Sequence, residues 1–176
     1  MIGYKFIKSD MMSENGKFKW KLGLWKVHKG EISLCNSGYH ACKEPLDSLE
    51  YVYGARWFIV EAKGKIIHGE DKFVAMKMRI IKEIPVKDVV VGFAIACARR
   101  SLKYWNKKFP DDDKTLKAIE TVKKYMKGEI PLDDLNAARS DRSARSAWSV
   151  AKSIARSADR KWQNKTLKKL IKEAKE

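Results

Sequence analysis

The spacing of apolar residues changes close to Pro85, and this change limits the chain to a mixed fold. Before Pro85, short segments rich in aromatic and β-branched residues alternate with Gly-containing turns, as is typical of strands. After it, apolar residues recur at every third or fourth position, which is typical of amphipathic helices. We therefore predict an α+β fold, with a small β-rich domain carrying a short helix over residues 1–87 and an all-α helical bundle over residues 88–176.

The first half contains the local signals of strands, turns and one helix. Asn15-Gly16 predicts a tight turn, and residues 45–54 predict a short helix that ends at Gly54. In the last predicted strand Val74, Met76, Met78 and Ile80 share one face, and Lys77 and Arg79 share the other. The predicted strands are residues 3–7, 17–27, 56–64 and 72–84.

The second half contains three helical patterns. Residues 88–108 carry apolar and small side chains at steps of three and four residues. Residues 110–128 begin with Pro and three aspartates, which suit the positive end of a helix dipole, and end at Gly128. In the last pattern alanines recur every seven residues, a spacing that lets helices approach closely: Ala137, Ala144, Ala151 and Ala158.

Positive charge is the property that most restricts the class of partner. The chain has 38 lysines and arginines and 22 aspartates and glutamates, which gives a net charge of +16. Such a field attracts polyanions and speeds their encounter with the protein. We therefore predict that the basic helical half binds nucleic acid or an acidic host or phage protein, through Arg139, Arg142, Arg145, Lys152, Arg156 and Arg160.

Three further features predict where the protein acts. No apolar run approaches the roughly 20 residues that a spanning helix needs, so we expect no membrane contact. Residues 1–10 lack the pattern of an export signal. Three cysteines, an odd number, indicate reduced thiols. These features predict a cytoplasmic protein in a bacterial host cell.

The segment LCNSGYHACKEPLDSLEY, residues 34–51, holds candidate metal and catalytic residues. Cys35, His40 and Cys42 follow the spacing C-x4-H-x-C, but a structural zinc site usually needs four ligands in two pairs. In a strand His40 and Cys42 would share a face, which leaves open a thiol nucleophile with a histidine base. We predict neither a metal nor a cofactor, and we interpret the Gly-Tyr-His-Ala-Cys stretch as a strand and turn of a small domain.

An alternative enzymatic interpretation rests on the order of polar and aromatic residues after this segment. The order resembles the core of ADP-ribosyltransferase-like domains: His40 comes first, Tyr51 and Tyr53 follow, and Arg56 and Glu61 lie on a later strand. That resemblance implies an enzyme in which His40, Tyr53 and Glu61 surround a nucleotide such as NAD.

Residues 1–85 as a whole resemble an uncharacterised domain family of phage and prophage proteins. The resemblance rests on the opening Tyr4–Phe6, on residues 34–51 in the form LCxxGYHACxxPLDxLxY, and on the FxVEAxG strand of Phe58–Gly64. Residues 88–160, with FAIACARRSL and the Ala/Arg repeat AARSDRSARSAWSVA, resemble a helical region of bacterial immunity proteins. The two resemblances imply a mobile-element origin and a role in phage–host or toxin–immunity conflict.

The sequence therefore predicts a non-enzymatic interaction protein of the counter-defence or immunity type. The nucleotide-binding enzyme described above is the first alternative. A structural component of a virion or of its assembly, with the Ala-rich helix as an oligomer seam, is the second.

Overall fold

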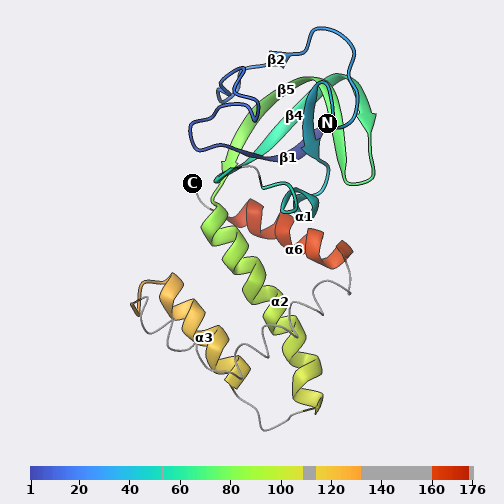
Figure 1. The fold of residues 1–176 in the computed structure, drawn as a ribbon. Helices are drawn as coiled ribbons and strands as arrows, with labels where there is room; N and C mark the ends of the chain where they lie inside the picture. The colour runs from blue at the N-terminus through green and yellow to red at the C-terminus, as the bar shows by residue number, and fades with distance from the viewer. Residues whose placement is uncertain (53, 109–113, 132–159, 175–176) are drawn as a thin grey trace. The chain divides into compact units, whose positions relative to one another are not determined.

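The computed structural model describes residues 1–52, 54–108, 114–131 and 160–174, and the account below concerns those residues. They form a mixed α+β structure with an antiparallel sheet, as the sequence predicts (Figure 1). The strands are β1 (Ile2–Ile7), β2 (Lys26–Val27), β3 (Tyr39–Cys42), β4 (Arg56–His68) and β5 (Lys72–Ile84). The helices are α1 (Pro45–Ser48), α2 (Val86–Lys108), α3 (Lys114–Met126) and α6 (Arg160–Glu173).

The sheet is built around the long β4–β5 hairpin. β1 pairs along β4 from Ile2↔Glu61 to Ile7↔Arg56, and β3 pairs along the first residues of β5. β1 and β3 are joined by a single pair, Tyr4↔Cys42. These pairings make a closed ring of four antiparallel strands, β5–β3–β1–β4, and β2 pairs with Lys77 and Met78 of β5.

The interior of this ring is filled by side chains from both long strands. Phe58, Val60, Phe73, Met78 and Ile80 belong to one buried cluster and are each less than 2% exposed. The predicted alternation is present in β5 over residues 77–80, where exposed Lys77 and half-buried Arg79 alternate with buried Met78 and Ile80. It ends at Ile81, which is exposed, where the register between β4 and β5 shifts. Burying such large side chains stabilises a fold by about 1.5–3 kcal/mol each, so the hairpin supplies much of the core.

Local turns and hydrogen bonds explain two departures from the expected elements. The Asn15-Gly16 turn is present, with Gly16 at φ 70° and the Asn15 side chain bonded to Ser13 Oγ. The expected strand over residues 17–27 is reduced to β2 and isolated bridges, because Gly23 takes a left-handed conformation, φ 76°, in its middle. The expected helix over residues 45–54 ends at Ser48, whose Oγ donates to the Pro45 carbonyl.

Helices α2 and α3 match the periodic segments of the sequence closely. Ala98, Leu102 and Ile119 form a small buried cluster, with Ile95 packed against it. Leu116 of α3 is 51% exposed. All four alanines of the seven-residue repeat lie outside the described residues, so the helical bundle stays a prediction.

The chain divides into two compact units, Met1–Val89 with Leu167–Glu176, and Val90–Thr166. We call the first of these the strand-rich unit. The second half of α6 belongs to it: Leu167 and Ile171 are buried, and Lys168 Nζ lies 2.7 Å from Glu44 Oε2 at the start of α1. Figure 1 shows α6 beside α1. The separate division of the chain at residue 87 stays a prediction.

Candidate functional site

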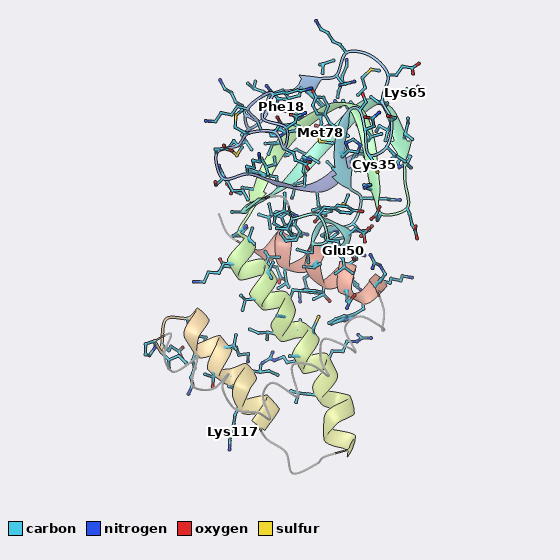
Figure 2. The ribbon with its side chains drawn as sticks, in the orientation of Figure 1. Phe18, Cys35, Glu50, Lys65, Met78 and Lys117 are labelled. Atoms are coloured by element: carbon cyan, nitrogen blue, oxygen red, sulfur yellow. The ribbon has the colours of Figure 1, made fainter. Side chains whose placement is uncertain are left out.

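A groove of about 1070 Å³ opens on the strand-rich unit. Its lining comes from β1, from residues 13–20, from the loop that leads into β3, from β3 itself and from Lys72 at the start of β5. Phe18 and Cys35, which lie in different parts of this lining, are labelled in Figure 2. This volume is at the upper end of the roughly 300–1,000 Å³ that small-ligand sites occupy.

His40 lies in the groove and fixes the loop before β3. Its Nε2 accepts a hydrogen bond from the backbone N–H of Cys35 at 3.0 Å, and Cys35 has φ 63°, which is uncommon for a residue other than glycine. Burial lowers the pKa of His40, and nearby Lys5 lowers it further, against a hydrogen bond to the Ser33 backbone that raises it. The imidazole is therefore neutral at pH 7 and acts as an anchor for the backbone of residues 33–37.

The two cysteines of the segment have different surroundings. Cys35 is exposed, whereas Cys42 is buried on β3 and burial raises its pKa to about 12. A thiol with that pKa is protonated at pH 7 and is a poor nucleophile. Among the residues that the structure describes, no group of three or more His, Cys, Asp and Glu side chains is placed to hold a metal ion.

Glu61, the acidic residue of the enzymatic alternative, lies on β4 directly opposite Arg79 on β5. Its Oε2 is 2.6 Å from an Arg79 guanidinium nitrogen, and its Oε1 is 3.5 Å from Lys63 Nζ. The hydrogen bond from Arg79 lowers the pKa of Glu61, which is absent from the groove lining. Along β5, His40 pairs with Val74 and Glu61 pairs with Arg79. These two β5 residues are five positions apart, which is a separation of roughly 16 Å at 3.3 Å per residue.

The structure therefore does not bring Glu61 and His40 together, and Tyr53, the third residue of that set, lies outside the described residues. Tyr51 does line the groove, and its hydroxyl donates to Asp71. Arg56, which was grouped with them in the sequence, binds Glu83 instead, with Nε and a terminal nitrogen at 2.7 and 2.5 Å from the carboxylate oxygens.

The basic residues predicted as a binding face fall mostly outside the described part of the chain. Arg139, Arg142, Arg145, Lys152 and Arg156 lie there, so their role stays a prediction. Arg160, the last of the set, is the first residue of α6 and is exposed.

The sequence prediction missed a second basic feature on α6. Lys161, Lys165, Lys168 and Lys172 follow at steps of four, three and four residues, which places them along one side of a helix. All four are exposed, whereas Gln163, Leu167 and Ile171 form the buried stripe of the same helix. We call these four residues the lysine row. Their spacing was visible in the sequence, so the signal existed.

Lys5 was also missed, and here the sequence held no signal. It stands between Tyr4 and Phe6 in a strand, where alternation predicts a lysine that points to solvent. In the structure its side chain is half-buried in the groove, and its Nζ donates to the His40 carbonyl at 2.9 Å.

The described residues thus form a mixed α+β structure, and a lined groove opens on its strand-rich unit. A sequence model described as "Domain of unknown function (DUF7666)" matches residues 1–92, more than half of the chain, and the chain belongs to that family. A second model, described as "Imm-5 like putative immunity protein", matches residues 83–163, and this part of the chain is similar to it. No curated protein and no solved structure matches the chain.

One further finding concerns the helices. None of those the structure describes is long and apolar enough to cross a bilayer.

Proposed function

We propose that the protein is a non-enzymatic interaction protein of a phage or other mobile element, of the immunity or counter-defence type. Its basic helical half binds an acidic surface of a partner protein, and the strand-rich unit acts as a docking module. The observation that carries this proposal is the similarity of residues 83–163 to an immunity protein. Immunity by direct binding needs a complementary surface and no reaction.

The charges on α6 support an acidic partner. Lys161, Lys165 and Lys172 have no ion pair with any residue that the structure describes, and only Lys168 of the row is neutralised, by Glu44. Like charges at four-residue steps destabilise a helix slightly. A row of this kind is therefore a cost to the free protein that an acidic partner would remove.

Nucleic acid is the second candidate partner, and the net charge of +16 favours it. A protein that neutralises several phosphates releases counterions, so its affinity falls steeply with salt. The affinity for an acidic protein also falls with salt. Excess duplex DNA of any sequence should not displace such a protein, whereas it would displace a bound nucleic acid.

The nucleotide-binding enzyme with His40, Tyr53 and Glu61 has less support. A catalytic carboxylate must reach the substrate, whereas Glu61 is held by Arg79 and Lys63 and is absent from the groove lining. The virion component stays an alternative that sedimentation of the full chain would test.

The experiment that tests the proposal compares partner classes at low salt. Heparin retention is measured first, then fluorescence anisotropy with labelled duplex DNA, single-stranded DNA and RNA, and then pull-down with acidic proteins from the host and its phages. We expect one saturable acidic protein partner whose binding survives excess duplex. If duplex DNA displaces the acidic protein, nucleic acid becomes the favoured partner. If no probe binds, both the acidic protein and nucleic acid are excluded as partners.

Substitutions separate binding from catalysis. We expect His40→Ala and Glu61→Ala to leave binding unchanged, and the triple variant Arg142→Glu, Arg145→Glu, Arg156→Glu to abolish it. An enzyme predicts the reverse pattern, together with consumption of NAD by the purified protein.

A further inference from the structure

The groove lies where β1 and β3 separate. Neighbouring residues of a strand point to opposite faces of a sheet, yet Lys5 and Phe6 of β1 both line the groove, as do Tyr39 and His40 of β3. Tyr4↔Cys42 is the only pair between these strands. The groove therefore reaches the backbone edges of both strands, and it is a slot in the ring and not a hollow on one face.

Lys5 places its side-chain amine inside this slot. Its Nζ contacts the His40 carbonyl at 2.9 Å, and no carboxylate among the described residues forms an ion pair with it. Desolvation lowers the pKa of Lys5, and the negative charge of Glu14 opposes that shift only in part. A poorly solvated ammonium without a counter-ion destabilises a fold, so an anion in the slot would gain from the interaction.

Lys72 supplies a second cation to the same lining. Its Nζ lies 4.6 Å from the centre of the Tyr51 ring, and a hydrogen bond with Cys35 raises its pKa, so it is charged at pH 7. Lysines outnumber carboxylates in the lining by three, Lys5, Lys17 and Lys72, to one, Glu14. His40 is neutral and its Nε2 is occupied, so the lysines would hold the anion.

Aromatic rings also line the groove. Phe18, Trp20 and Tyr39 meet edge to face, with ring centres 5.1 to 5.7 Å apart. Trp20 is buried, but Phe18 and Tyr39 are only half-buried and keep surface toward the groove. Half-buried rings of this kind bind planar groups by stacking, whatever the hydrogen-bonding pattern of the planar group.

We propose that this groove binds a nucleotide, with its phosphate against Lys5 and Lys72 and its base against Phe18 and Tyr39. A free phosphate would use only the lysines, and an acidic peptide would leave the rings without a planar partner. The volume of about 1070 Å³ accommodates a mononucleotide or dinucleotide. This site involves none of the helical residues of the proposed function.

The test is calorimetric titration of the full chain with the four ribonucleoside monophosphates, their nucleosides and inorganic phosphate, at constant ionic strength. We expect at least one monophosphate to bind tenfold or more tightly than both its nucleoside and phosphate. Absence of binding by all four at millimolar concentration overturns the proposal. Equal affinity for nucleoside and nucleotide overturns the role of the lysines, and equal affinity for phosphate overturns the role of the rings.

Two variants assign the ends of the ligand. Lys5→Met should lower the affinity for the nucleotide tenfold or more and leave the affinity for the nucleoside unchanged. It should also raise the melting temperature of the free protein, because it removes an unpaired, poorly solvated charge. Phe18→Leu should lower the affinities for the nucleotide and for the nucleoside by the same factor. Wild-type nucleotide affinity in Lys5→Met, with the protein folded, contradicts the proposal.

Controls separate this site from the helical half. Lys29→Met, at an exposed lysine outside the groove lining, should bind nucleotide as the wild type does. The variant Lys161→Glu, Lys165→Glu, Lys172→Glu should also keep nucleotide binding while losing the acidic partner. Loss of nucleotide binding in that variant would place the nucleotide on the helices and overturn the groove.

Discussion

On β4 and β5 arginines lie against carboxylates, whereas on α6 lysines lie along an exposed row. Arg79 and Glu61 face each other across β4 and β5, and Arg56 binds Glu83 with two hydrogen bonds. Among the residues that the structure describes, only Lys168 of the lysine row has a carboxylate partner, Glu44. The difference indicates that paired cations serve the fold and that the row is available to a partner.

The same contrast holds for apolar side chains. The strand-rich unit buries Trp57, Phe58 and Phe73 almost completely, whereas the described part of the second unit buries only a small cluster around Ala98 and Leu102. Among the described residues, most of the buried apolar side chains therefore belong to the strand-rich unit. The predictions below use substitutions in both regions.

The largest effect is expected at Trp57. Its ring stacks on Phe6 with centres 5.3 Å apart, and its Nε1 donates to Ser48 Oγ at 2.9 Å. Trp57→Ala should lower the free energy of unfolding by about 3–5 kcal/mol, since it leaves a cavity and removes the hydrogen bond that Ser48 Oγ accepts. Urea denaturation measures this. Leu116→Ala, at an exposed position of α3, should change it by less than about 0.5 kcal/mol, and equal losses would contradict the contrast.

A smaller effect is expected at Gly38, which precedes β3. Both Gly38 and Gly30 have φ 106°, but a Cβ at Gly38 would lie 2.6 Å from Val74 Cγ2, whereas at Gly30 nothing lies within 4 Å. Each Gly→Ala change costs roughly 1 kcal/mol or more for the backbone conformation. Gly38→Ala should cost at least about 1 kcal/mol beyond Gly30→Ala because of the clash. Thermal unfolding of the two variants measures the difference. Equal losses of stability would show that the backbone around Gly38 shifts enough to relieve the clash.

Acid should destabilise the strand-rich unit through its paired carboxylates. The hydrogen bond from Arg56 holds the pKa of Glu83 below 4.5. Its contribution is therefore complete above about pH 5 and is lost as the pH falls through 4.5 toward the pKa of the folded protein. Because the pair is well exposed, the loss is about 0.5 kcal/mol.

Denaturation at pH 7 and pH 3 measures this contribution. Glu83→Gln should be less stable than the wild type at pH 7 and should lose less stability between the two values. An unchanged pH dependence in Glu83→Gln would mean that the pair contributes nothing in solution.

The smallest effect is expected within α6. Lys169 and Glu173 form an exposed pair at a four-residue step, with Nζ and Oε1 3.8 Å apart. Lys169→Ala should change the unfolding free energy by about 0.3 kcal/mol. A loss above about 1 kcal/mol would show that cations of α6 serve the fold, which would weaken the contrast between the two regions.

Much of the fold could be predicted because its signals are local. β5, Lys72–Ile84, follows from the aromatic and apolar residues of that segment alone, and α2 and α3 follow from their three- and four-residue periodicity. The Asn15-Gly16 turn needs only its own residues.

The candidate site was less predictable because it depends on pairings between distant segments. Lys5 enters the groove because β1 meets β3 some 35 residues later and pairs with it at one position. Glu61 and His40 lie apart because β4 and β3 pair with different parts of β5. Neither fact can be derived from spacing along the sequence.

The most direct test of the account compares two triple variants of equal net charge on a heparin column. Lys161→Glu, Lys165→Glu, Lys172→Glu reverses three charges of the lysine row, and Lys21→Glu, Lys29→Glu, Lys77→Glu reverses three exposed lysines of the strand-rich unit. Each reversal lowers the charge by two, so both variants have +10 in place of +16. The account predicts that the α6 variant elutes at clearly lower salt than the strand variant. Elution of both at the same salt would contradict it, because binding would then follow total charge and not the helical half.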